Sequence, residues 1–183
     1  MNYLRLIAAV SVAAALTGAA SPGFAMTGEC FWGRLSPATR DAFLRGYARL
    51  GEEVLDRVAV SDEEYAGIDS ACGADAADPA IKDRLLAATV IEHGAAVFLQ
   101  GRLGWDAPAV QLAWDRLGPE QLDRLHDQAL QALRGEAREA DVTGAARRFL
   151  GERADGDRDV LDQARAYLTG RAMRETIERS DRS

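Results

Sequence analysis

The sequence predicts an all-α protein, a single-domain irregular bundle of about six or seven helices. Three observations support this. Ala, Leu, Arg, Glu and Gln, which all favour helices, dominate the composition. No stretch shows the alternating β-branched pattern of a strand, and no Asn-Gly or Asp-Gly pair joins two apolar runs. Gly and Pro residues fall where helices would begin and end, and no heptad pattern persists.

Residues 1–25 have the organisation of a cleavable secretory signal peptide. Arg5 supplies a positive charge, an apolar run follows over Leu6–Leu16, and small residues lead to Ala25. The apolar run is about eleven residues long, shorter than the roughly 20 that a membrane-spanning helix needs. We expect cleavage after Ala25, with Ala20 as the alternative site. The mature protein should then be periplasmic or secreted, without a stable membrane anchor.

Residues 26–183 then form the helical domain, and capping residues place its helices. Ser36 followed by Pro37 begins the first helix, in which Gly51 predicts a kink or a break. Ser61 and Glu64 form a capping box at the start of the second. From the N-terminus, helices are expected over 36–58, 61–72, 78–103, 106–117, 118–133, 142–150 and 157–179.

The segment Leu85–Leu103 is apolar on nearly every side, which is typical of a helix at the centre of a bundle. The first and last helices, in contrast, each show a single apolar stripe. We therefore predict that Leu85–Leu103 belongs to the most buried helix. Glu92 in its middle then needs a cationic partner, and Arg outnumbers every other candidate for that role.

Cys30 and Cys72 are the only cysteines, and both follow the predicted leader. In an oxidising compartment such a pair predicts one structural disulfide, and a pair of free buried thiols is the alternative. Closing a loop of this size contributes about 4 kcal/mol in the chain-entropy model. A metal site is not expected, because only two histidines remain to complete it.

Composition and motifs narrow the function classes. The net charge of −7 disfavours binding to nucleic-acid phosphates, and no basic run offsets it. The sequence contains no Gly-x-Ser-x-Gly, His-Glu-x-x-His, Cys-x-x-Cys or glycine-rich phosphate loop. We therefore expect no cofactor and no metal, and the balance leans against an enzyme.

Glu92, His93 and His126 are the weak candidates for catalytic residues, since a buried carboxylate beside an imidazole has the pKa shifts that acid–base catalysis uses. A structural role is favoured for the first two, because neighbouring helix residues point about 100° apart and do not face each other. Four aromatic side chains near helix ends are candidates for lining a ligand pocket: Phe31, Trp32, Trp105 and Trp114.

Three functional hypotheses follow, in this order. The first is a periplasmic or extracellular protein-interaction module, which would bind another protein through an exposed helical face. The second is a carrier that holds a small apolar ligand between helices around Leu85–Leu103. The third is an enzyme that uses Glu92, His93 or His126.

The leader hypothesis makes a direct prediction. Mass spectrometry of the exported protein should find a chain that begins at Met26, because small residues occupy both specificity positions before the cleavage point. A recovered chain that still contains Leu6–Leu16 would show that the protein is anchored rather than released.

Overall fold

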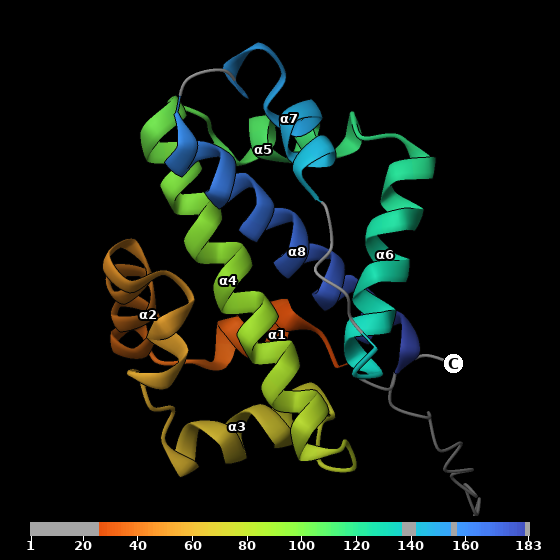
Figure 1. Cartoon of the computed structure of the whole chain (residues 1–183). Helices are drawn as coiled ribbons and strands as arrows, with labels where there is room; N and C mark the ends of the chain where they lie inside the picture. Colours follow the sequence, from red (N-terminus) through yellow and green to blue (C-terminus); the bar gives the residue numbers. More distant parts are fainter. Residues whose placement is uncertain (1–25, 137–141, 155–156, 182–183) are drawn as a thin grey trace, which may run out of the picture.

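The computed structural model describes residues 26–136, 142–154 and 157–181, and within them the chain is all-α (Figure 1). The predicted signal peptide lies outside the described residues. The described residues form eight α-helices and two 3₁₀ turns: α1 (Gly28–Arg34), α2 (Pro37–Leu50), η1 (Gly51–Asp56), α3 (Asp62–Cys72), α4 (Pro79–Leu103), α5 (Ala107–Asp115), α6 (Pro119–Leu133), α7 (Thr143–Leu150), η2 (Gly151–Ala154) and α8 (Arg158–Ser180).

The predicted helix starts are confirmed by the capping contacts. The Ser36 side chain accepts a hydrogen bond from the backbone N–H of Thr39 at the start of α2. Ser61 and Glu64 form both bonds of the capping box of α3. Gly51 has a φ of 58°, a conformation that favours glycine, and there the chain leaves α2 and tightens into η1.

Helix α1 was not predicted, since the sequence placed the first helix start at Ser36. Seven residues are too few to show a helical period, so contacts with distant residues must hold α1 in place. Its N-terminus is capped by Thr27, whose side chain accepts a hydrogen bond from the backbone N–H of Cys30. Phe31 is completely buried in the core.

The predicted disulfide between Cys30 and Cys72 is confirmed, with the two Cα atoms 5.8 Å apart. It joins α1 to the end of α3. Because structural disulfides persist in oxidising environments, this bond indicates a compartment outside the cytoplasm.

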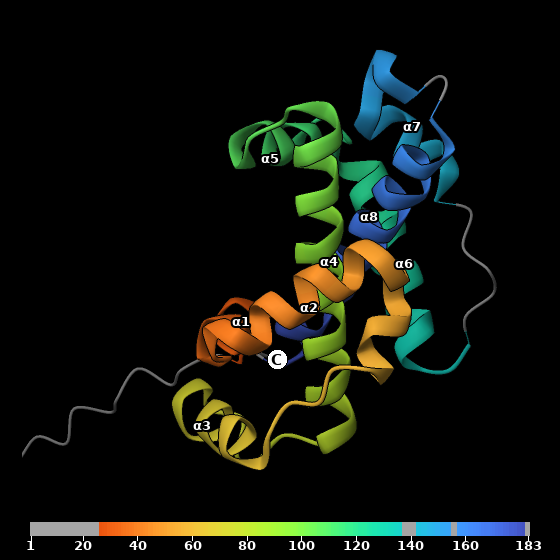
Figure 2. The same ribbon diagram turned by 90° about the vertical axis from the view of Figure 1, so that its left-hand side faces the viewer.

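Helices α4 and α8 cross at the centre of the molecule and make the most extensive contact between any two elements (Figures 1 and 2). Helices α1 and α2 pack on α4, whereas α6 and α7 pack on α8. The central position predicted for Leu85–Leu103 is confirmed, but the prediction that its helix alone is the most buried is wrong. Helices α4 and α8 bury nine residues each.

The two central helices approach each other closely at Gly170. A Cβ atom placed there would lie 2.9 Å from the carbonyl oxygen of Ala88 and 3.0 Å from the amide nitrogen of Glu92. Gly94, on α4, similarly makes room for the ring of Tyr47 from α2. Glycine at these positions therefore lets the neighbouring elements approach as closely as they do. Among the described helices, none is long and apolar enough to cross a membrane.

Replacing Gly170 with Ala should separate the central helices and lower the free energy of unfolding by about 1–3 kcal/mol, because the added methyl group would press on backbone atoms that cannot move aside. Gly101→Ala is the matched control. Nothing lies within 4 Å of a Cβ atom at that position of α4, so this change should stabilise the protein by up to about 1 kcal/mol. Urea unfolding of both variants tests this, and equal stabilisation by the two changes would contradict it.

Candidate functional site

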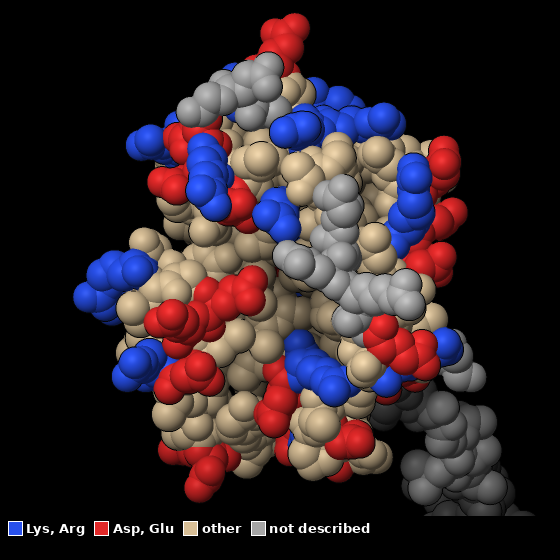
Figure 3. Space-filling model, in the orientation of Figure 1, with Lys and Arg blue, Asp and Glu red and all other residues tan. Residues whose placement is uncertain are grey.

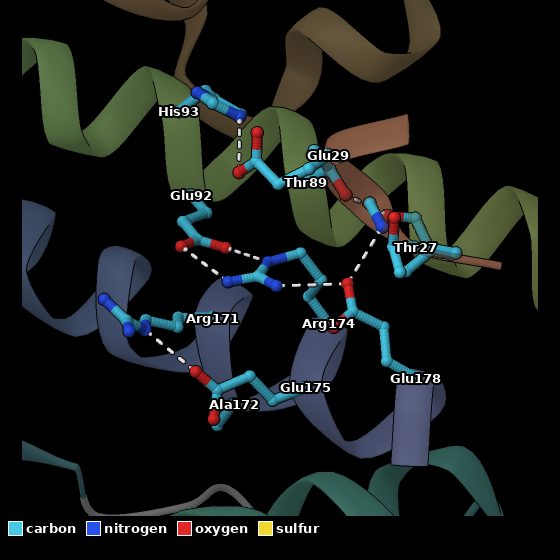
Figure 4. Close-up of polar contacts among 12 residues, drawn as sticks. Thr27, Glu29, Thr89, Glu92, His93, Arg171, Ala172, Arg174, Glu175 and Glu178 are labelled. Atoms are coloured by element: carbon cyan, nitrogen blue, oxygen red, sulfur yellow. Dashed lines mark hydrogen bonds and ion pairs between the residues drawn. The ribbon is translucent and has the colours of Figure 1, made fainter. Parts of the chain in front are cut away.

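Glu92 and His126 lie where α4 and α6 meet α8, among charged side chains contributed mainly by α8, whereas His93 lies where α4 meets α1. Figure 4 shows Arg171, Arg174, Glu175 and Glu178 along α8, with Glu92 facing them from α4. We refer to Glu29, Glu92, His93, His126, Arg171, Arg174, Glu175, Glu178 and Arg179 together as the seam cluster.

Arg174 is the cationic partner that the sequence required for Glu92. Its Nε and Nη2 atoms donate to the two carboxylate oxygens of Glu92, at 2.5 and 3.1 Å. Its Nη1 atom donates to Glu178 at 3.0 Å, and Glu178 also accepts a bond from the backbone N–H of Gly28 at 2.9 Å. One partly buried guanidinium thus connects α4, α8 and, through Glu178, α1.

A second group of contacts joins α6 to α8 around Glu175. This carboxylate contacts Nε2 of His126 at 3.0 Å and accepts a bond from Nε of Arg171 at 3.0 Å. Burial favours a higher pKa for Glu175, but the bonds from His126 and Arg171 outweigh it and lower the pKa to about 2. Arg171 also donates to the Tyr167 hydroxyl, and its guanidinium lies 4.4 Å from the centre of the Trp114 ring.

His126 has a partner on each ring nitrogen. Nδ1 lies 3.3 Å from Nη1 of Arg179, and Nε2 faces Glu175. The neutral tautomer with its proton on Nε2 satisfies both contacts, because Nδ1 then accepts from the guanidinium. The imidazole therefore links α6 to two side chains of α8.

His93 turns away from Glu92 and toward α1. Its ring stacks on Trp32, with the ring centres 4.4 Å apart and the planes 9° from parallel. Nε2 lies 3.5 Å from a carboxylate oxygen of Glu29, which is long for a hydrogen bond. The contact with His93 is the main cause that lowers the pKa of Glu29, against the opposing effect of burial.

The structure thus places all three candidates in one region but gives each a different partner. Glu92 binds Arg174, His93 contacts Glu29, and His126 contacts Glu175. The seam cluster can hold four helices together, but its geometry does not direct the three candidates at one reacting atom. Within the described residues, no group of three or more His, Cys, Asp or Glu side chains could hold a metal ion.

The α8 side chains of the seam cluster were not among the predicted site residues. Their only signal was the spacing of opposite charges four residues apart, as in Arg171 with Glu175 and Arg174 with Glu178. That spacing is equally common on exposed helix faces. It became informative only when α8 was found to be central.

Two apolar hollows adjoin at Leu133, on the side where α6 faces the N-terminal half of α4. The first, of about 260 Å³, has Gly170 and Met173 of α8 at its floor. The second, of about 350 Å³, lies by the ends of α6 and α8 and is lined by Leu130 and Ile177. Figure 3 shows uncharged surface sinking inward between α4 and α6.

The four aromatic residues suggested by the sequence do not line these two hollows. Phe31 is buried, Trp32 stacks on His93, Trp105 packs edge-on against Phe149, and Trp114 contacts Arg171. Most of the lining is aliphatic or small: Ala87, Ala88, Ile91, Ala132, Leu133, Gly170 and Met173 in the first hollow, and Met26, Ala77, Ile81, Leu130, Leu133 and Ile177 in the second. Polar and charged residues complete it: Glu52, Arg84 and Thr169 in the first, and Asp78, Arg134, Ser180 and Asp181 in the second.

No protein family, no curated protein and no solved structure matches the chain.

The pKa of Glu175 predicts how stability depends on pH. Because folding lowers this pKa from 4.5 to about 2, its contribution is fully present above pH 4.5 and is lost as the pH falls toward 2. Glu175→Gln should remove up to about 3 kcal/mol at neutral pH and should flatten the decline between pH 4.5 and 2. Denaturant unfolding measured across this range tests the prediction.

Stability should still fall to some extent between pH 4.5 and 2 in the Glu175→Gln variant, because the pKa of Glu64 is also lowered to about 2. Hydrogen bonds from Ser36, Thr39 and Ser61 cause this shift and outweigh the effect of burial. Glu120→Gln, at a side chain that is 86% exposed on α6, is the control for the loss of one carboxylate. If Glu175→Gln and Glu120→Gln gave the same stability profile, the role assigned to Glu175 would be wrong.

Proposed function

We propose that this protein is an exported carrier, which binds a small and mostly apolar ligand in the hollows between α4, α6 and α8. The observation that carries the proposal is the pair of adjoining apolar hollows, which meet at Leu133. The volume of the second, about 350 Å³, lies at the lower end of the roughly 300–1,000 Å³ of ligand pockets, and that of the first, about 260 Å³, lies just below it.

The distribution of apolar surface favours a carrier over a protein-interaction module. Among the described residues, the large apolar side chains that are exposed are Leu50, Val97 and Leu112, on three different helices. A large contiguous apolar patch on the surface is a typical mark of a protein-interaction site. The hollows instead hold their apolar side chains below the surface, where a small molecule can reach them.

The floor of the first hollow suits ligand binding. Gly170 has no side chain, and its neighbours there are Ala88 and Met173. Small residues leave space, while an unbranched methionine adapts its shape to what it contacts. Gly170 itself serves the helix crossing, because the backbone of α4 at Ala88 and Glu92 occupies the position that a side chain would take there.

Two features support a location in the periplasm or outside the cell. One is the disulfide between Cys30 and Cys72. The other is the signal-peptide pattern of residues 1–25. An exported carrier would meet its ligand in that compartment.

A protein-interaction module is the second candidate. Leu112 is 59% exposed on α5, which projects from one end of α4 (Figure 2). An enzyme that uses Glu92, His93 or His126 gains least support, because each of these side chains is already engaged with a charged neighbour.

Filling the first hollow should weaken ligand binding without unfolding the protein. Ala132→Phe places a ring at the hollow wall and should weaken binding of the neutral fluorescent probe N-phenyl-1-naphthylamine by about tenfold or more. Ala66→Phe on the exposed face of α3 is the matched control and should bind like the unaltered protein. Fluorescence titration measures binding, and thermal unfolding verifies that both variants are folded.

The carrier proposal fails if the unaltered protein does not bind the probe, or if Ala132→Phe binds it as well as Ala66→Phe does. Loss of binding in a Leu112→Ser variant instead would favour the interaction surface at α5.

A further inference from the structure

We infer that the ligand is a single-chain amphiphile with one anionic head group, such as a long-chain carboxylate, and that Arg84 binds the head. This inference rests on the proposed carrier function and specifies its ligand class. It places the head where the two hollows adjoin and the apolar chain along the floor of the first hollow.

The position of Arg84 is fixed by one hydrogen bond. Its Nη1 atom donates to the backbone carbonyl oxygen of Leu133 at 2.8 Å, so the side chain of an α4 residue reaches the last residue of α6. Leu133 lines both hollows. The guanidinium therefore lies beside their junction.

The remaining donors of Arg84 are available to a ligand. Within the part of the chain that the structure describes, no carboxylate oxygen forms an ion pair with Arg84. A guanidinium has five N–H donors in a planar fork, and a carboxylate can accept two of them side by side. Arg84 is thus a cation at the edge of an apolar hollow, which is the arrangement that an anionic amphiphile requires.

The charges around the first hollow also fix the direction in which the amphiphile lies. Arg84 is the basic residue of its lining, whereas Glu52 of η1 is the acidic one. The side chain of Arg84 reaches toward α6, and η1 lies on the α2 side of α4 (Figure 1). A carboxylate head is repelled at the Glu52 edge and attracted at the Arg84 edge.

The occupant is a monomeric amphiphile and not a membrane surface. The net charge of −7 opposes approach to an anionic bilayer. Insertion into a bilayer also needs protruding apolar side chains, whereas those of the hollows are recessed. A single chain that enters the hollow from solution avoids both obstacles.

The test compares dodecanoate with dodecanol, which share a chain but differ in charge, each below the concentration at which it aggregates. The unaltered protein should bind dodecanoate about fivefold more tightly in calorimetry, the upper range for an exposed ion pair. Arg84→Gln should bind the two equally and retain the affinity for dodecanol. Arg45→Gln, at an exposed arginine of α2 that lines neither hollow, is the matched control and should keep the preference.

Chain length gives a second measurement. Each methylene added between decanoate and dodecanoate should tighten binding about fourfold, the factor expected for burying one methylene group. Ala132→Phe should reduce this dependence because it fills the space that the chain occupies.

The inference is overturned if the unaltered protein shows no preference for the carboxylate, if Arg84→Gln keeps it, or if Arg45→Gln loses it as well. The carrier proposal survives each of these results provided that the neutral probe still binds. If neither the probe nor either amphiphile binds, both proposals fail. Flotation with vesicles of phosphatidylcholine and phosphatidylglycerol should leave the protein unbound, and flotation that depends on Arg84 would overturn the monomeric ligand.

Discussion

The close crossing of α4 and α8 at Gly170 is the constraint on which the rest of the structure depends. With only a hydrogen atom at that position, the backbone of α8 reaches the backbone of α4 near Ala88 and Glu92. Glu92 then meets Arg174 one turn further along α8, at a distance that permits two hydrogen bonds. Removing one member of such a buried pair typically costs about 3–5 kcal/mol, since the other charge is left without a partner. Other members of the seam cluster connect α8 to further helices: Glu178 contacts α1, and Glu175 contacts His126 on α6.

The same crossing separates two kinds of surface. At the seam cluster, charged groups meet partners within the chain, and Arg174 and Glu92 use their hydrogen-bonding atoms on each other. Toward α6, small residues around Gly170 leave apolar side chains uncovered in the first hollow. Acid–base catalysis needs an acid or a base that is free to react with a substrate, and the candidate residues at the seam already have charged partners. Binding of an apolar chain is favoured at the hollow, because burying its methylene groups there removes them from water.

Much of the fold could be predicted because local interactions determine it. Ser61 with Glu64 and Asp78 with Pro79 set helix starts through contacts that span only a few residues, and these starts are where the sequence placed them. Helix α1 could not be found in this way, because it is short and depends on a disulfide and on Glu178, 150 residues away from Gly28. The central position of α8 was also missed, because hydropathy treats Arg174 and Glu178 as surface residues when in fact they are buried as a pair.

The candidate site was predictable only in part. The sequence required an Arg partner for Glu92, and the structure identifies it as Arg174. The partners of His93 and His126 come from α1 and α8, and no local pattern indicates that these segments meet. The hollows depend on which side chains of three helices adjoin, so Arg84 and Leu133 had no signal in the sequence. Their proximity arises from packing alone.

The most direct test of the proposed ligand site is a titration of the isotope-labelled mature protein with dodecanoate. Backbone amide chemical shifts in NMR spectra are the readout. We predict that the largest changes in chemical shift occur around the first hollow, at Arg84, Ala132, Gly170 and Met173. Changes centred on Leu112 of α5, or on Trp32 and His93 at the far side of the seam, would contradict it. So would a spectrum that dodecanoate leaves unchanged.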